Sequence, residues 1–125
     1  MAELLILLLP LIAQVESGNN PDAIGDNGKA IGCMQIWKVC VDDVNRISGK
    51  HYTYKDRLSR RKSFEMAKIY LKHYGKAYEK KTGHKADMEI LSRIWNCGYA
   101  GSQKGHKYYD KGTRYWHKIK KEGEK

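Results

Sequence analysis

The sequence predicts a mainly α-helical (α+β) domain that carries one small β-hairpin. Three observations support this: an apolar N-terminal stretch, several later stretches with apolar residues at helical spacing, and one segment dense in turn-forming residues. A chain of 125 residues with 41% hydrophobic and 30% charged residues has the composition of an ordinary globular domain. We therefore expect a single domain over residues 1–125.

The N-terminal stretch 3–16 is apolar on every side of a helix, with Gln14 and Glu16 as its polar end. This pattern predicts a central helix that is buried on all sides and that Gly18 ends. The stretch is shorter than the roughly 20 apolar residues that a membrane span requires. It also carries Glu3 where a signal peptide has Lys or Arg, so we expect neither a membrane span nor a cleaved leader.

Segment 18–32 is dense in glycine, asparagine and aspartate. Within it, Asn27-Gly28 is the preferred pair for a two-residue type I′ turn between two short strands. The segment therefore predicts a small hairpin with Asp26 at its tip.

Two helices are predicted in the middle of the chain. The first ends at Gly49 and has apolar residues at helical spacing, namely Ile36, Cys40, Val44 and Ile47. Residues 49–62 lack a consistent period and predict a basic surface connection. The next helix is capped by Ser63 and ends at Gly83, and its core-facing stripe consists of Ala67, Tyr70, Leu71, Tyr74 and Tyr78.

Two further helices are predicted in the last third. The first ends at residues 96–98, and its apolar face consists of Met88, Leu91, Ile94 and Trp95. A glycine-rich loop then runs through Gly112, and a short last helix starts at Thr113. The tail 120–125 is expected to be solvated and frayed.

The charge balance predicts a polyanionic partner. Twenty-four Lys and Arg against fourteen Asp and Glu give a formal charge of +10, which attracts nucleic acid, anionic membranes or the acidic bacterial cell wall. The basic residues are scattered along the chain and form no single arm. Charge alone therefore leaves a nucleic-acid binder open.

The cysteines favour free thiols. Cys33, Cys40 and Cys97 cannot close a full disulfide set, and no Cys or His spacing indicates a zinc site. We expect buried free thiols, no metal and folding in a reducing cytosol.

Glu16 is the first candidate for chemistry. A carboxylate at the end of an apolar helix is costly to ionise, so its pKa is expected to rise. A protonated carboxyl group can then donate its proton to a glycosidic oxygen. An exposed glutamate at a helix end is the alternative.

Four motifs carry a family resemblance. Segments 15–23 (VESGNNPDA) and 28–36 (GKAIGCMQI) resemble the opening of soluble lytic transglycosylases and goose-type lysozymes, which have Glu-Ser, Pro-x-Ala and then Gly-x-x-Gly-x-Met-Gln. Segment 93–98 (RIWNCG) resembles the Ala-Tyr-Asn-Ala-Gly segment of that family. Segment 113–116 (TRYW) resembles its Thr-x-x-Tyr segment, and both later motifs also resemble invertebrate-type lysozymes. The resemblance covers roughly residues 11–119 and implies a lysozyme-like fold with the hairpin beside the catalytic cleft.

The resemblance also implies roles for residues. Glu16 becomes the general acid and Ser17 an orienting hydroxyl beside it. The substrate-binding residues that it implies are Ser17, Met34, Gln35, Trp95, Asn96 and Tyr115. Core packing is the alternative for Met34 and Tyr115, and a capping or turn role is the alternative for Gln35 and Asn96.

Asp26 is the second candidate carboxylate. In invertebrate-type lysozymes a similarly placed aspartate is the catalytic partner of the glutamate, and most glycosidases use two carboxylates. Formation of the Asp-Asn-Gly turn is the alternative role for Asp26. Its presence favours hydrolysis over transglycosylation.

The sequence therefore predicts a cofactor-free lysozyme (muramidase) that cleaves the β-1,4 bond between N-acetylmuramic acid and N-acetylglucosamine. A lytic transglycosylase giving 1,6-anhydro products is the first alternative, and a catalytically weak wall-binding module is another. We expect a monomer that binds peptidoglycan and no nucleic acid. Made in the cytoplasm without an evident leader, it would act on the wall as an endolysin of a phage or mobile element.

Overall fold

The computed structural model describes all residues, Met1–Lys125, and divides them into two compact units. One unit is Ile12–Tyr70, and the other combines Met1–Leu11 with Leu71–Lys125. Two helices, α1 (Ala2–Ser17) and α3 (Arg60–Thr82), contribute residues to both units. The single domain over 1–125 stays a prediction, whereas a mainly α-helical chain with one small hairpin is confirmed.

Helix α1 matches the predicted 3–16 stretch closely, but the prediction of burial on every side is wrong. Leu5, Leu8 and Ile12 are fully buried, whereas Ile6 and Leu7 are 72% and 62% exposed. Residues three and four apart share one face of a helix, so α1 buries one stripe although its sequence is apolar all round.

Strands β1 (Ile24–Gly25) and β2 (Ala30–Ile31) form the predicted antiparallel hairpin. The two-residue turn is wrong, because four residues, 26–29, connect the strands and include a short 3₁₀ turn, η1 (Asp26–Gly28). Asn27 and Gly28 both have positive φ, as a type I′ turn requires, but Asp26 also has a φ of 48°. This extra left-handed residue widens the connection, which still carries Asp26.

A second tight turn follows, since Ile31 and Ile36 pair across residues 32–35. Helix α2 (Lys38–Ser48) then ends at Gly49 as predicted. Gly49 has a φ of 71°, and its N–H donates to the Asn45 carbonyl at 2.8 Å. Ile36 precedes α2 and lies in the pairing with Ile31.

The predicted surface connection 49–62 is partly wrong. It contains a 3₁₀ turn, η2 (Tyr54–Leu58), whose start is held by the Thr53 N–H donating to Asp56 Oδ2 at 2.8 Å. Helix α3 begins at Arg60, and Ser63 lies inside it, buried, rather than at its cap. Ser59 takes the capping place, because its hydroxyl accepts the Lys62 N–H at 3.2 Å.

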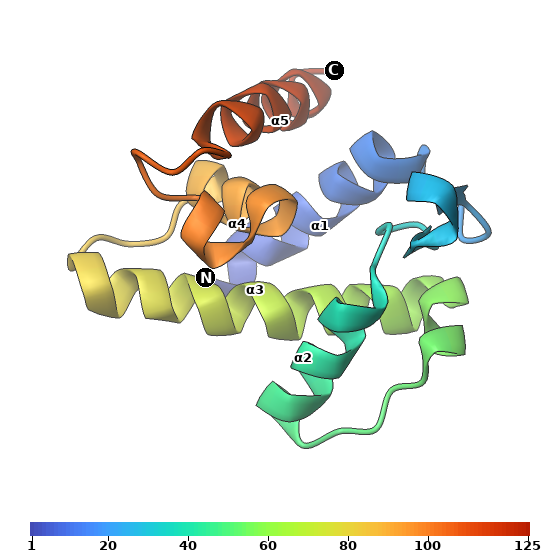
Figure 1. Cartoon of the computed structure of the whole chain (residues 1–125). Coiled ribbons are helices and arrows are strands. Elements are labelled where there is room, and N and C mark those ends of the chain that lie inside the picture. The colour runs from blue at the N-terminus through green and yellow to red at the C-terminus, as the bar shows by residue number, and fades with distance from the viewer. The chain divides into compact units, whose positions relative to one another are not determined.

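The C-terminal helices pack against each other within their unit (Figure 1). Helix α3 ends before Gly83 as predicted, and α4 (Met88–Gly101) is capped by Asp87, whose Oδ1 accepts the Ile90 N–H at 2.9 Å. Gly98 has φ 75° and ψ 171° and interrupts α4 where the sequence predicts its end. Residues of α4 beyond this break continue to Gly101.

The predicted start of the last helix at Thr113 is wrong, since α5 runs over Tyr109–Gly123. Gly112 lies inside α5, where an added Cβ would lie 3.1 Å from Cys97 Sγ and 3.4 Å from Arg93 Nη1. This glycine therefore permits close packing and does not mark a loop. The helix also includes most of the tail that the sequence predicts to fray.

Candidate functional site

Glu16 and Ser17 occupy the C-terminal end of α1. Glu16 is half-buried. The Ser17 hydroxyl donates to the Cys33 carbonyl at 2.8 Å and accepts the Asn20 N–H at 3.0 Å. It also lies 3.1 Å from the Ala13 carbonyl oxygen. Ser17 thus joins the end of α1 to the turn at residues 32–35, next to the candidate acid.

Gln35 lies in that turn with a φ of 53°, which is uncommon for a residue other than glycine. Its Nε2 donates to the Gly32 carbonyl at 3.0 Å and to the Ala23 carbonyl at 3.3 Å. Its Oε1 lies directly against Gly25, where a Cβ would clash. The Gln35 amide therefore connects the turn to β1.

Met34 is fully buried. Core packing, the alternative considered for Met34, accounts for this burial. Its contact with substrate stays a prediction.

Arg57 is a structural residue of this region that the sequence does not identify. It is 7% exposed, and its guanidinium donates to three main-chain carbonyls, those of Tyr54 at 2.8 Å, Ile36 at 3.0 Å and Lys29 at 3.4 Å. Burial lowers the pKa of the Arg57 guanidinium. Arg57 therefore binds the main chain just before β2 and at the end of the turn that follows β2.

The main chain of Arg57 also contacts the turn at residues 32–35. Its carbonyl accepts the Ser63 hydroxyl at 2.9 Å and lies so close to Gly32 that a Cβ there would clash. Gly32 also has a φ of 85°. Only glycine fits this position, which explains one glycine of the Gly-x-Met-Gln motif.

Asp26 lies in the connection between β1 and β2, in the same unit as Glu16. It is exposed, and its carboxylate has no hydrogen-bond partner. Asp26, Asn27 and Gly28 have positive φ in succession. Asp and Asn tolerate this conformation better than other residues do, so the turn alone accounts for an aspartate here.

The other candidate residues lie in the second unit. Asn96 Oδ1 accepts Lys111 Nζ at 3.3 Å and the Cys97 thiol at 3.2 Å. Trp95 is half-buried and Tyr115 is 7% exposed. The structure therefore places Trp95, Asn96 and Tyr115 within one unit and the remaining candidates within the other.

A second buried arginine joins the two later motifs. Arg93 Nη2 donates to Thr113 Oγ1 at 2.9 Å, and Nη1 donates to the Tyr109 carbonyl at 3.1 Å. Its Nε pairs with Glu89 Oε2 at 2.9 Å, and the guanidinium stacks 4.1 Å from the Tyr109 ring centroid. Segments 93–98 and 113–116, far apart in sequence, thus meet at one side chain.

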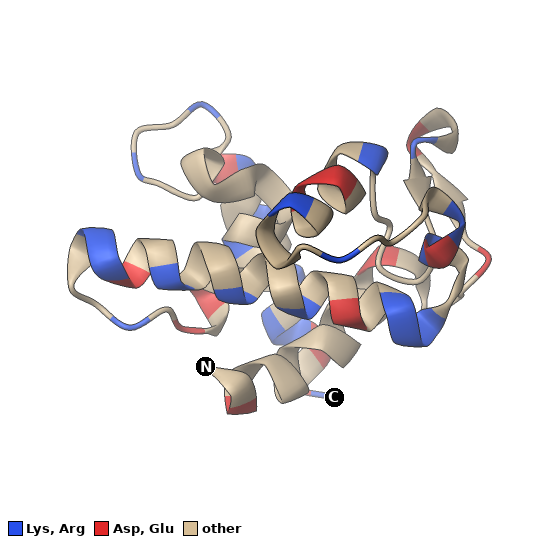
Figure 2. Ribbon diagram, turned by 90° about the horizontal axis from the view of Figure 1, so that it is seen from below, with Lys and Arg blue, Asp and Glu red and all other residues tan.

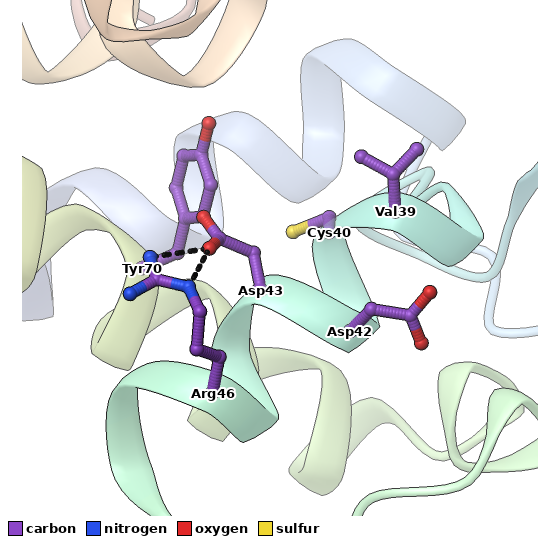
Figure 3. Close-up of a pocket in the computed structure, with 6 residues that line it drawn as sticks. All are labelled: Val39, Cys40, Asp42, Asp43, Arg46 and Tyr70. Carbon is purple, nitrogen blue, oxygen red and sulfur yellow. Dashed lines mark hydrogen bonds and ion pairs between the residues drawn. The ribbon is translucent and has the colours of Figure 1, made fainter.

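A pocket of about 400 Å³ lies on α2 and is a feature that the sequence does not predict (Figure 3). Its lining residues are Val39, Cys40, Asp42, Asp43, Arg46 and Tyr70. Arg46 Nη2 pairs with Asp43 Oδ1, and Asp42 accepts the Tyr54 hydroxyl at 2.8 Å. The charged groups of the pocket therefore satisfy one another or nearby groups.

The three cysteines are free thiols, as predicted; Cys33 is buried, and Cys40 and Cys97 are half-buried. Burial, together with the nearby Asp43 carboxylate, raises the pKa of Cys40 to about 12. Burial also raises the pKa of Cys33 and of Cys97.

We expect the native protein to react slowly with iodoacetamide at neutral pH, because only the thiolate is a good nucleophile. Mass spectrometry should show three adducts after unfolding in urea and little labelling before it. Rapid labelling of Cys40 in the folded protein would contradict its raised pKa.

No helix of the protein combines the length and the apolar content that a membrane-spanning segment needs.

Comparison with known protein families identifies the family to which the chain belongs. Residues 3–116 match the family described as Transglycosylase SLT domain, which takes in Glu16, the hairpin, Asn96 and Tyr115. No curated protein and no solved structure matches the chain. The mainly α-helical architecture with its small hairpin is the lysozyme-like fold, as the resemblance implies. The chain therefore belongs to the Transglycosylase SLT domain family, whose members are enzymes that cleave the glycan strands of peptidoglycan.

Proposed function

We propose that the protein cleaves the β-1,4 bond between N-acetylmuramic acid and N-acetylglucosamine, with Glu16 as the general acid. The observation that carries this proposal is the join between the end of α1 and the Gly-x-Met-Gln turn, where Ser17 donates to the Cys33 carbonyl at 2.8 Å. This contact fixes the backbone beside Glu16, and a general acid requires such a fixed position. Both segments lie within the matched range 3–116.

The reaction that we propose is lytic transglycosylation. The Glu16 carboxyl group protonates the bridging glycosidic oxygen, and the bond from that oxygen to C1 of the muramic acid breaks. The 6-hydroxyl oxygen of the same sugar bonds to C1 and closes a 1,6-anhydro ring. Its proton passes to the Glu16 carboxylate, which restores the acid. No cofactor enters this balance.

The family match favours this reaction, and so does the setting of Asp26. A carboxylate that activates water or forms a glycosyl intermediate must be held in position. The Asp26 carboxylate is exposed and has no hydrogen-bond partner, whereas the Asp26 carbonyl accepts the Lys29 N–H at 3.2 Å, so we assign Asp26 to the turn.

The other candidates divide into two roles. We assign Ser17 and Gln35 as positioning residues, because their side chains bind main-chain carbonyls within the chain. We assign Trp95 and Asn96, which are half-buried, to contacts with the sugar. Met34 and Tyr115 are both buried, and we assign each to packing within its own unit.

Hydrolysis is the second candidate, and the presence of a second carboxylate, Asp26, in the hairpin connection favours it. In that reaction Asp26 would activate a water or hold a glycosyl intermediate, and the product would carry a normal reducing end.

The proposed site of action is the bacterial wall, and the proposed working form is a monomer.

Mass spectrometry of digested peptidoglycan distinguishes the two reactions, because the anhydro product lacks one water. We expect anhydro products to dominate and Asp26→Asn to keep activity within about threefold of the unmodified protein, since a turn role survives this change. Asp22→Asn, an exposed neighbour in the same unit, is the matched control.

Reducing-end products together with severe loss in Asp26→Asn alone would establish the two-carboxylate lysozyme instead. Tight binding to walls with no products at all would indicate a wall-binding module.

A further inference from the structure

Helix α3 carries four exposed lysines at intervals of four residues, Lys68, Lys72, Lys76 and Lys80. The last three lie in one unit, and we call these three the lysine row. Figure 2 shows the basic positions recurring along this helix. Four residues of helix advance about 6 Å, so neighbouring members of the row lie about one turn apart. None of the three has an acidic partner.

The lysine row does not help the helix to form. Like charges four residues apart repel each other and destabilise a helix. In the first turns of the same helix, by contrast, a basic residue has an acidic partner, because Arg61 pairs with Glu65 at 2.9 Å, four residues on. Since folding alone does not account for an unpaired row of lysines, a ligand with matching negative charges is the better explanation.

The surroundings of the row indicate what kind of polyanion it fits. The Phe and Tyr side chains on α3 are half-buried, and Tyr74 already contacts His73 and stacks on Tyr99, so none of them offers nucleobases a fully exposed ring to stack on. On α3, Met66, Ala67 and Leu71 are buried and Phe64 and Ile69 are half-buried, so this helix presents no large, fully exposed apolar side chain to insert into a membrane. Spaced anionic groups on a linear chain suit the row better than either.

We propose that the lysine row binds a phosphodiester polymer attached to the peptidoglycan that the enzyme cleaves. Each ammonium group would contact a separate phosphate along the polymer, and this would hold the enzyme on its insoluble substrate. The inference rests on the proposed action at the wall, so binding and cleavage must be measured separately.

Binding is measured by sedimentation with purified walls in a Glu16→Gln background, which prevents the walls from being digested. The row variant replaces Lys72, Lys76 and Lys80 with Gln. The control variant removes the same charge from three other exposed lysines of the same unit, Lys85, Lys118 and Lys120. Half of the walls are treated with hydrofluoric acid, which hydrolyses the phosphodiesters and leaves the glycan.

On untreated walls at low salt, the row variant is expected to bind about tenfold more weakly than the parent, and the control variant within about twofold of it. On stripped walls the parent should bind as weakly as the row variant. Equal losses in both variants would overturn the proposal, because net charge alone would then explain binding. A row-dependent difference that persists on stripped walls would overturn it in favour of the carboxylates of peptidoglycan.

Duplex DNA serves as the competing polyanion. Row-dependent binding to DNA that is tighter than binding to untreated walls would overturn the wall-polymer assignment. Cleavage is measured without the Glu16 change, on soluble glycan fragments that carry no phosphate, and the row variant should keep the full rate there. If the unmodified protein fails to cleave these fragments, the proposed function fails, while the binding comparison still decides the role of the row.

Discussion

Replacing Glu16 with Gln is expected to lower the rate of wall lysis by about 100-fold to 10,000-fold, the range that general acid catalysis contributes. Glutamine keeps the shape of the side chain but cannot supply a proton to the glycosidic oxygen. Ser17 and its contact with the Cys33 carbonyl remain in place, so the site keeps its backbone geometry. The loss of turbidity of a suspension of purified walls measures the rate.

The matched control is Glu3→Gln, which removes the same charge from an exposed residue in the first turn of the same helix. This variant should lyse walls at the rate of the unmodified protein. Circular dichroism and the melting temperature establish that both variants are folded. A folded Glu16→Gln protein with activity within about tenfold of the parent would refute the role of Glu16.

The sequence predicts the helical framework well, because two local patterns determine it. Apolar residues at helical spacing indicate the helices, and left-handed glycines mark where they end. Gly49 and Gly83 both have positive φ and donate to the carbonyl four residues earlier. Each therefore ends its helix by a mechanism that the sequence alone displays.

Errors arise where tertiary packing decides the role of a residue. Glycine is common in loops, but Gly112 lies inside α5, where its lack of a side chain lets Cys97 and Arg93 approach closely. Serine is a common helix-capping residue, but Ser63 lies inside α3, where its hydroxyl donates to the Arg57 carbonyl. Neither partner is near in sequence, so no local pattern could indicate it.

In the candidate site, too, local motifs indicate which residues matter, and tertiary packing decides what they bind. The motifs identify Ser17, Gln35 and Asn96 as residues with a specific role, and each has a specific hydrogen bond. What the sequence cannot tell is whether a polar side chain faces a substrate or the protein's own main chain. Ser17 and Gln35 bind main-chain carbonyls instead, because the fold brings the carbonyls of residues 23, 32 and 33 within hydrogen-bond distance of them.

Buried arginines are the residues that sequence reasoning misses most clearly. Arg57 lies in a basic stretch that predicts a solvated surface, and it is 7% exposed. A charged side chain is rarely buried unless it is paired, and here main-chain carbonyls replace the usual carboxylate. Hydropathy patterns contain no information about such partners.

Replacing Arg57 with Met is expected to lower the free energy of unfolding by about 2 to 4 kcal/mol. Methionine keeps much of the volume but removes every donor, so the Tyr54 and Lys29 carbonyls lose the guanidinium and the Ile36 carbonyl keeps only the Ile31 N–H. A hydrogen bond to a charged group contributes about 1.5 to 3 kcal/mol. Arg57→Lys should lie between the parent and Arg57→Met, because an ammonium keeps the charge but not the fork of donors.

The matched control for Arg57 is Arg61→Met, since the Arg61 side chain is 75% exposed and pairs only with Glu65. That change is expected to cost less than about 1 kcal/mol. Urea unfolding followed by circular dichroism measures the difference between the two variants. If both variants lose the same stability, the three carbonyl contacts of Arg57 do not hold the hairpin.

A local measurement separates loosening of the hairpin from general destabilisation. In Arg57→Met, the amides of Ile31, Gly32 and Ile36, which are bonded within the hairpin and its second turn, should exchange with deuterium faster. Amides in α4, such as Ile90 at its cap, should keep their relative protection. Wall lysis should fall in the still folded protein, because Gln35 and the backbone beside Glu16 depend on the turn that Arg57 holds. Unchanged exchange at Gly32 and Ile36 with normal lysis would show that Arg57 stabilises the protein without positioning the site.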